Sequence, residues 1–372
     1  MQEILFGIDA LPSAIGQCRR PMLVCDGSYR FLGTRDKIDS ALGEKAGGSP
    51  LVVFSSFASN PLYEDVCKGV DLFRREGCDC ILAVGGGSSL DTAKCIKLFG
   101  GMDPRGGNYL TREWTPSDVK LIAIPTTAGT GSESTRYAVI YFEGKKQSIT
   151  HEGIIPNIAI LDGEALRTLP PYQRKCTLLD ALCQGIESWW SVNSTPESVG
   201  YSRACVEGIM RDWRGYINDD NGALYDRMML HANYGGRAIC VTQTTAPHAF
   251  SYKLTSTYGL PHGHAVAVCL PEIWAFMIGN MQGCVDPRGQ QYLWGVFCDI
   301  ASALGAGSPS EGVDLFRSLL GDLHIENPVS PSPREDIEML SGSVNPLRLS
   351  NNPVRLTSGD MAAIYSKVLG VS

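Results

Sequence analysis

The sequence contains no run of about 18 apolar residues, the length that a membrane-spanning helix needs. Its first residues, MQEILFGIDALPSAIG, do not combine a basic stretch with a following apolar stretch. We therefore expect no secretory signal, no membrane partner and a cytoplasmic location. CxxC pairs are also missing, although the chain has 13 cysteines. Because the closest pair, Cys78 and Cys80, is CxC, a zinc knuckle or a disulfide framework has little support, and most cysteines are expected to be reduced core residues.

The sequence also has fewer basic than acidic residues. The net charge of −7 argues against a nucleic-acid partner, although it leaves room for a local basic pocket that binds a small anion. A hydrophobic content of 44% and a charged content of 19% are typical of a folded globular protein. At 372 residues the chain is too long for one core, so we expect two domains, and a homodimer is compatible with this size.

Short aliphatic runs alternate with helical patterns in the first 165 residues, which is typical of a parallel sheet with crossover helices. These runs are MLVC at 22, LVVF at 51, ILAV at 81, LIAI at 121 and IAIL at 158. One crossover helix is predicted to start at Asn60 and Pro61, to bury Leu62, Val66, Val70 and Phe73, and to end at Gly77. Strand signals nearly vanish after residue 169. We therefore predict an α/β dinucleotide-binding domain at 1–168 and an all-α domain, for metal and substrate, at 169–372.

A glycine-rich turn joins the third of these runs to a helix, in ILAVGGGSSLDTAKCIKLF. Gly85, Gly86 and Gly87 lack a Cβ, so a pyrophosphate could approach the main chain there, next to the positive end of the helix dipole. Ser88 and Asp91 are spaced as a capping box and are assigned to the cofactor site with the glycines. The pattern is not GxGxxG, and a tight turn without a ligand is the alternative.

A second loop, IPTTAGTGSES, follows the next strand and carries several hydroxyl groups. Thr126, Thr127 and Thr130 suit contacts to a nucleotide that lies across the carboxyl ends of parallel strands. Two such loops after neighbouring strands are hard to explain as turns alone. We also assign Lys146 to the cofactor site.

Asp26 follows the first of the aliphatic runs, in LVCDGS. Its carboxylate could accept hydrogen bonds from a ribose diol and repel a 2′-phosphate, which favours NAD over NADP. Ser28 and Arg30 could instead serve a 2′-phosphate, and a solvated turn aspartate is an equal alternative.

The stretch DALCQGIESWW places Asp180, Gln184 and Glu187 on one face of a predicted helix. This face could simply be exposed to solvent. However, three of the six histidines of the chain, His248, His262 and His264, lie within PHAFSYKLTSTYGLPHGH. Because borderline divalent metals bind imidazole together with carboxylate, one aspartate, two histidines and a weaker amide oxygen form a candidate metal site.

Four motifs carry a resemblance to a known family: GGGSSLDTAK, PTTAGTGSE, the helix starting at Asp180, and PHG. In this combination and order the chain resembles the iron-containing (group III) alcohol dehydrogenases over nearly its whole length. The resemblance implies the dehydroquinate synthase-like architecture of an α/β and a helical domain, with NAD or NADP and a divalent metal as cofactors. Fe²⁺ is the metal expected, with Zn²⁺, Mn²⁺ or Ni²⁺ as alternatives.

Carried over to this sequence, the resemblance implies Asp180, His248 and His262 as metal ligands. Gln184 takes the fourth position, where the family usually has histidine, and an amide oxygen is a weaker donor than imidazole. Tyr252 is a second departure, because many members carry a histidine there. Proton transfer would then use Tyr252, His264, water or the ribose hydroxyls.

Within the family, ESWWSVNSTPES and VNPLRLSNNPVRLT look most like the branch that reduces phosphonoacetaldehyde to 2-hydroxyethylphosphonate in phosphonate metabolism. A phosphonate needs cationic partners, and arginine can bind its oxygens in a bidentate fashion. The candidates are Arg136, Arg174, Lys253, Arg348 and Arg355, with ordinary surface charge as the alternative for each.

Three other functions stay open at this point. The first is reduction of a neutral short aldehyde or a diol by a similar dehydrogenase. The second is a metal- and NAD-dependent lyase that resembles the sugar-phosphate cyclases, although PTTAGTGSE and PHG favour the dehydrogenase. The third, suggested by Gln184, is a protein that binds the cofactor without turnover.

Overall fold

The computed structural model describes residues 2–115, 117–219 and 221–371, except for the side chains of residues 347 and 348. The chain forms two compact units, 1–170 with 220–236, and 171–219 with 237–372. This division differs from the boundary after residue 168 that the sequence pattern predicts, which places 220–236 in the helical domain.

Segment 220–236 packs with the first unit through close backbone contacts. The Gly163 amide donates to Asp226 Oδ1 at 2.9 Å. A Cβ atom on Gly131 would lie 2.4 Å from the Cα atom of Gly236. Such contacts between residues far apart in the sequence have no local sequence signal, which explains the different assignment.

The first unit is built on a six-stranded parallel sheet with the order β1-β8-β5-β4-β2-β3, and β6 and β7 form a separate antiparallel hairpin. The strands are β1 (Glu3–Phe6), β2 (Pro21–Cys25), β3 (Val52–Phe54), β4 (Cys80–Gly85), β5 (Lys120–Pro125), β6 (Tyr137–Phe142), β7 (Lys145–Thr150) and β8 (Ile158–Leu161). The helices of this unit are α1 (Leu11–Ala14), α2 (Arg35–Ala46), α3 (Tyr63–Arg75) and α4 (Gly87–Gly100).

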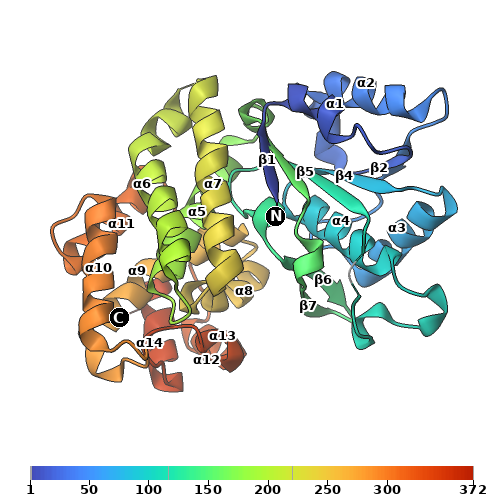
Figure 1. Cartoon of the computed structure of the whole chain (residues 1–372). Coiled ribbons are helices and arrows are strands. Elements are labelled where there is room, and N and C mark those ends of the chain that lie inside the picture. Colours follow the sequence, from blue (N-terminus) through green and yellow to red (C-terminus); the bar gives the residue numbers. More distant parts are fainter. Residues whose placement is uncertain (1, 116, 220, 372) are drawn as a thin grey trace. The chain divides into compact units, whose positions relative to one another are not determined.

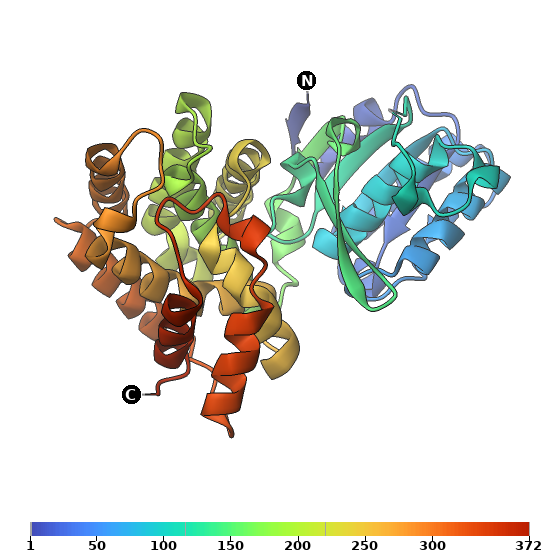
Figure 2. The same cartoon turned by 90° about the horizontal axis from the view of Figure 1, so that it is seen from below.

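Both faces of the sheet are buried, because successive side chains of a strand point to opposite sides. In β4, Ile81 and Ala83 join one core with α3 and α4, whereas Leu82 and Val84 join the other core with α1 and α2. Figure 1 shows α2 and α3 on opposite sides of the strands. The hairpin packs its strand β6 on α4 and α3 (Figure 2). The predicted parallel α/β architecture is therefore confirmed.

The crossover helix α3 starts later than the sequence pattern predicts. Its first residue is Tyr63, and Leu62, expected in the buried stripe, is 46% exposed. Pro61 and Leu62 are extended instead, because Pro61 O accepts a hydrogen bond from Tyr141 N and Leu62 bridges to Tyr141. The end is as predicted, since Gly77 follows the helix with a φ of 63°.

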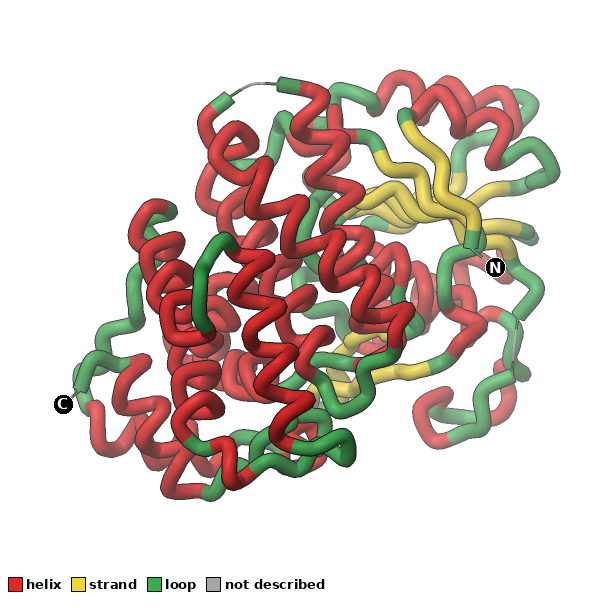
Figure 3. The backbone as a smooth tube through the Cα atoms, turned by 60° about the vertical axis from the view of Figure 1, so that its left-hand side comes forward, coloured by secondary structure: helices red, strands yellow, loops and turns green. Residues whose placement is uncertain are grey.

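The second unit is helical, and no strand occurs among its described residues (Figure 3). Its helices are α5 (Pro171–Trp190), α6 (Pro196–Asn218), α8 (Ala246–Tyr258), α9 (His262–Gly279), α10 (Gln290–Leu304), α11 (Pro309–Asp322), α12 (Pro333–Ser343), α13 (Pro346–Leu349) and α14 (Ser358–Val368). Helix α7 (Gly222–Thr242) begins in the first unit and ends in the second. α5 packs against α6 and α9, and Trp190 and Trp274 are fully buried in this core. Within the described part of the chain, no helix is both long and apolar enough to cross a membrane.

Candidate active site

The glycine turn at the end of β4 contains positions that need glycine for different reasons. Gly85 has a φ of 150°, and a Cβ atom there would lie 2.3 Å from Ser89 Oγ, so the fold itself requires glycine. Gly86 is extended, with a φ of −79°, and a Cβ atom there would meet only Thr127 at 3.5 Å. The protein thus leaves space at Gly86 that its own fold does not use, beside the N-terminus of α4.

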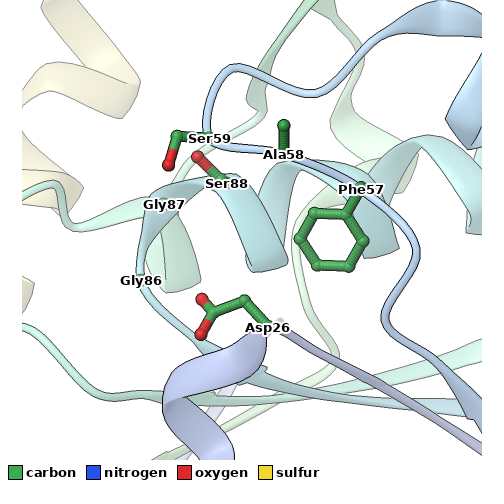
Figure 4. Close-up of a pocket in the computed structure, with 7 residues that line it drawn as sticks. All are labelled: Asp26, Phe57, Ala58, Ser59, Gly86, Gly87 and Ser88. Atoms are coloured by element: carbon green, nitrogen blue, oxygen red, sulfur yellow. The ribbon is translucent and has the colours of Figure 1, made fainter.

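A pocket opens at this turn (Figure 4). It is lined by Asp26, Phe57, Ala58, Ser59, Gly86, Gly87 and Ser88. The Asp26 carboxylate lies on one side of the pocket, and the hydroxyls of Ser59 and Ser88 lie on the other (Figure 4). Four of the residues assigned to the cofactor site from the sequence therefore line one pocket.

Asp26 is held in a fixed orientation at the end of β2. Its Oδ1 accepts a hydrogen bond from the Ser28 amide at 2.7 Å, and its Oδ2 accepts one from Ser89 Oγ at 2.9 Å. Asp26 is therefore not a freely solvated turn residue, which was the alternative to a ribose contact. Arg30, the candidate for a 2′-phosphate, is exposed, and its guanidinium lies over the ring of Phe31 at 4.6 Å.

The predicted capping box at Ser88 and Asp91 is wrong. The N-cap of α4 is Gly86, which makes no side-chain cap, because the helix already begins at Gly87. Asp91 consequently lies in the second turn and faces inward, where it accepts hydrogen bonds from Ser132 Oγ at 2.8 Å and from the Val139 amide at 3.0 Å.

Asp91 and Lys94 together hold the second loop and β6 against α4. Burial raises the pKa of Asp91, and the charges of Lys94 and Lys146 oppose that rise. The Nζ atom of Lys94 donates to Ser132 Oγ, Thr135 Oγ1 and Tyr137 O at 2.8–3.0 Å. Lys94 belongs to the motif DTAK, but its sequence position alone does not predict these contacts. Both charged side chains of this motif therefore contact the second loop and β6.

The second loop lies next to the glycine turn. The Thr126 amide donates to Gly85 O at 3.0 Å. A Cβ atom on Gly86 would lie 3.5 Å from Thr127, and one on Gly87 would lie 3.2 Å from Thr130 Cγ2. Thr127 and Thr130 therefore both border the turn. The structure thus brings the two hydroxyl- and glycine-rich loops together.

A candidate metal centre lies in the second unit, where α5 carries Asp180, α8 carries His248 and α9 begins with His262. One ligand atom from each lies within 4.8 Å of the others, and the described residues contain no other such group of histidine, cysteine and acidic side chains. Asp180 Oδ1 is 3.4 Å from His248 Nε2 and 3.9 Å from His262 Nε2. This buried oxygen makes no hydrogen bond of normal geometry. A buried acceptor between two imidazole nitrogens fits a divalent cation.

Asp180 and His248 each shift the pKa of the other. Burial alone would raise the pKa of Asp180, but the neighbouring imidazoles of His248 and His262 hold it below its usual value. Burial disfavours a charged His248, yet Glu187 and Asp180 outweigh burial and raise its pKa to about 9. A metal ion must therefore compete with a proton for His248.

The polar face of α5 is buried and does not point to solvent. Asp180 and Gln184 are 3% exposed, and Glu187 is fully buried. The side chain of Gln184 helps to lower the pKa of Asp180. Glu187 contacts His248 from the side opposite to the metal centre, with 2.5 Å between Oε1 and Nδ1. The sequence pattern placed Glu187 on the right face but did not predict this contact.

Tyr252 and His264, the two candidate proton donors, have different surroundings. The ring of Tyr252 stacks on the ring of His262, with 5.9 Å between centroids and an interplanar angle of 5°. His264 Nδ1 accepts from Tyr172 Oη at 2.7 Å, and its Nε2 contacts Glu326 O at 2.7 Å. Both nitrogens of His264 are therefore engaged, and burial lowers its pKa. The structure thus places the ring of Tyr252 against the candidate ligand His262, whereas both nitrogens of His264 contact Tyr172 and Glu326.

The basic residues considered for an anionic substrate are placed unequally. Arg136 pairs with Glu152 in the first unit at 2.5 Å, and the Arg174 guanidinium lies 5.5 Å from the ring of Tyr216. Lys253 is half-buried and follows Tyr252 on α8.

Two arginines remain near the C-terminal end. Arg355 is exposed. The side chain of Arg348 lies outside the described residues, but the backbone of its helix, α13, packs against α8. Lys253 is therefore part of α8, the helix that carries His248, and α13 packs against this helix.

Comparison with known proteins agrees with this geometry. Residues 2–163 match the family described as "Iron-containing alcohol dehydrogenase", and residues 175–369 match "Fe-containing alcohol dehydrogenase family, C-terminal". A phosphonoacetaldehyde reductase of Streptomyces viridochromogenes is 35% identical over 245 residues, which cover 62% of this chain and 62% of that protein. The long-chain-alcohol dehydrogenase 1 of Geobacillus thermodenitrificans is 29% identical, over 92% of this chain and 88% of its own.

Among solved structures, an iron-containing alcohol dehydrogenase from Thermotoga maritima superimposes with a TM-score of 0.81 at 26% identity, and the match covers 100% of this chain and 98% of the other. The two family matches extend over nearly the whole sequence. The chain therefore belongs to the iron-containing alcohol dehydrogenase family and is a metal-dependent oxidoreductase.

Proposed function

We propose that this enzyme reduces a small anionic aldehyde, first of all phosphonoacetaldehyde, to its primary alcohol with NADH. The observation that carries the proposal is the group of Asp180, His248 and His262, in which Asp180 and His248 are buried and one Asp180 carboxylate oxygen is unpaired. These residues would hold a divalent ion, Fe²⁺ before Zn²⁺, Mn²⁺ or Ni²⁺. When bound there, the ion supplies a Lewis acid that polarises the carbonyl group of the aldehyde.

The residues of the first unit bind the reduced cofactor. The open space at Gly86 accepts the pyrophosphate, with Thr127 and Thr130 beside it, and Lys146 adds positive charge. Asp26 supports NADH over NADPH, because its fixed carboxylate lies in the same pocket and would repel a 2′-phosphate.

Residues of the second unit bind the aldehyde and supply the proton. When bound, the reduced cofactor would supply the hydride to the aldehyde carbon. Tyr252 Oη, whose ring is held against His262, would give the product oxygen its proton. Lys253 and Arg355 bind the phosphonate oxygens. Arg136 is excluded from this set, since Glu152 and Tyr137 already use its guanidinium.

The choice of an anionic substrate is supported by the 35% identical phosphonoacetaldehyde reductase and by Lys253 on the helix of His248. The second candidate is a neutral aldehyde, supported by the long-chain-alcohol dehydrogenase that matches more of the chain. A cytoplasmic homodimer completes the proposal.

A substrate panel tests the proposal directly. Metal-depleted protein is restored with Fe²⁺, Zn²⁺, Mn²⁺ or Ni²⁺ and assayed at 340 nm with NADH or NADPH against phosphonoacetaldehyde, propionaldehyde and hexanal. We expect kcat/KM for phosphonoacetaldehyde to exceed that for propionaldehyde about 10- to 100-fold, the size of one or two charged hydrogen bonds. Equal values would favour the neutral substrate, and no oxidation of either cofactor with any aldehyde would contradict the reductase.

A further inference from the structure

The Glu187 carboxylate is fully buried, yet it is not part of the group that could bind the metal ion. A carboxylate in a protein interior is tolerated only when hydrogen bonds replace its water. Glu187 has three such contacts: Oε1 with His248 Nδ1 at 2.5 Å, and Oε2 with the Thr245 amide at 2.8 Å and Thr245 Oγ1 at 3.1 Å. All of its partners lie at the start of α8, the helix that carries His248.

The contact with Glu187 determines how the ring of His248 is presented. Since Nδ1 faces Glu187, Nε2 faces Asp180 Oδ1, at 3.4 Å. A carboxylate that accepts from Nδ1–H keeps the proton on that nitrogen and leaves the Nε2 lone pair for a metal ion. Rotation of the ring would break this hydrogen bond.

The direction of the next hydrogen bond is fixed by Trp190. An indole N–H can only donate, and Trp190 Nε1 donates to Thr245 Oγ1 at 2.8 Å. The Thr245 hydroxyl has one hydrogen, which is then directed at Glu187 Oε2. Trp190 lies one turn after Glu187 on α5, so both ends of the chain of hydrogen bonds are anchored on one buried helix.

We propose that Trp190, Thr245 and Glu187 form a hydrogen-bond relay that positions His248 as a metal ligand. The relay rests on the metal centre of the proposed function and extends it by three residues that do not touch the metal. Glu187 acts directly on His248, whereas Thr245 and Trp190 act through Glu187. Loss of the relay should therefore weaken metal binding in that order and leave the cofactor pocket unchanged.

The test is competitive chelator titration of Zn²⁺ and Co²⁺ with three variants, Glu187→Gln, Thr245→Val and Trp190→Phe. We expect the dissociation constant to rise about 10- to 100-fold for Glu187→Gln, the usual effect of removing an outer-shell partner, and less for the other two. The visible spectrum of bound Co²⁺ should change in the same order. Thr245→Ser keeps the hydroxyl group and should therefore bind the metal with wild-type affinity.

Matched controls separate positioning from general damage to the core. Trp274 is also fully buried, lies 6.0 Å from the ring of Trp190, and its Nε1 makes no hydrogen bond. Trp274→Phe should therefore lower the melting temperature about as much as Trp190→Phe but leave metal affinity unchanged. Asp212→Asn, at another buried carboxylate of the same unit, is the control for Glu187→Gln.

The outcomes distinguish the relay from the function on which it rests. Wild-type metal affinity in folded Glu187→Gln, or equal losses in Trp190→Phe and Trp274→Phe, would overturn the relay while the reductase stands. If the wild-type protein binds neither Zn²⁺ nor Co²⁺ at the chelator concentrations used, the metal centre and the relay are both wrong.

Discussion

Gly263 lies so close to Cys176 that a Cβ atom on the glycine would be 2.0 Å from the Cys176 carbonyl oxygen. The same Cβ would be 2.9 Å from the Cβ atom of Asp180. Only glycine therefore lets the start of α9 approach α5, and this approach brings His262 to Asp180. The motif PHG thus places the candidate ligand His262 next to Gly263, whose missing side chain allows α9 to approach α5.

Gly263→Ala should push α9 away from α5. We expect the free energy of unfolding to fall by about 2–3 kcal/mol, as for overpacked cores, and Zn²⁺ affinity to fall with it. Gly279→Ala is the control on the same helix, since a Cβ atom there meets nothing within 4 Å. Urea denaturation and chelator titration check both variants. Similar behaviour of the two would show that the contact with Cys176 is unimportant.

Removal of a metal ligand should separate metal binding from cofactor binding. We expect His262→Ala and Asp180→Ala to reduce aldehydes at less than about 1% of the wild-type rate, because each removes a donor to the Lewis acid. NADH affinity, measured by fluorescence titration, should stay near the wild-type value. His324→Asn is the control, because His324 is exposed and asparagine tolerates its φ of 53°. A His262→Ala enzyme that keeps its turnover after exhaustive chelation would contradict the metal mechanism.

Gly86→Val should fill the space that the fold leaves at the glycine turn. We expect NADH binding to weaken about 10-fold or more through lost hydrogen bonds to the pyrophosphate, while unfolding and metal content stay unchanged. Gly85→Val should behave differently and destabilise the protein itself, because of its φ of 150° and its contact with Ser89. Unaltered NADH affinity in folded Gly86→Val would count against a phosphate site here.

Much of the first unit could be predicted because its strands are continuous apolar runs. The five runs in the sequence correspond to β2, β3, β4, β5 and β8. β1 and the hairpin of β6 and β7 were not predicted. β1 lies at an edge of the sheet and pairs with β8 across more than 150 residues, so its local sequence says little about its place.

The metal centre shows where local patterns stop being informative. Spacing on one helix placed Asp180, Gln184 and Glu187 on a common face, and this face is indeed directed inward. The pattern could not distinguish Asp180, which lies in the candidate metal group, from Glu187, which contacts His248, because Glu187 and His248 are 61 residues apart. Taken by residue type and position alone, His264 carried the same signal as His262. The family resemblance singled out His262, and the tertiary contacts of His264 with Tyr172 and Glu326 separate the two independently.

Lys97→Met should make the protein more stable at neutral pH. Lys97 is 3% exposed, and burial lowers its pKa from 10.5 to about 8. Below pH 8 the amine is charged in both the folded and the unfolded state, so the cost of burying the charge is fully present. Between pH 8 and 10.5 the folded protein releases this proton first, and the cost disappears.

The free energy of unfolding of the variant should therefore exceed that of the wild type by about 1–3 kcal/mol at pH 7, reduced by the contribution of the lost hydrogen bond to Asn157. This difference should shrink as the pH rises to 10.5. Urea denaturation of both proteins at pH 7, 8.5 and 10 measures this. A gain that does not depend on pH would show that hydrophobic packing, and not the buried charge, is responsible.

Gln184→His should tighten metal binding if the amide of Gln184 is a weak fourth ligand. Position 184 lies one turn from Asp180, is 3% exposed and already contacts the Asp180 carboxyl group, so a side chain there can reach the centre. Imidazole is the better donor to borderline divalent ions, and we expect the affinity to rise by at least the ~10-fold that an outer-shell partner contributes. The affinity should also depend more strongly on pH, because histidine must lose its proton to bind.

Turnover with a phosphonate aldehyde should fall in the same variant, because a stronger ligand leaves less room for an anionic substrate at the ion. Chelator titration at several pH values, together with steady-state kinetics, measures both effects, and Gln184→Leu is the control that removes the amide without adding a donor. Equal metal affinity in all three folded proteins would mean that position 184 does not touch the metal, and that Asp180, His248 and His262 hold it alone.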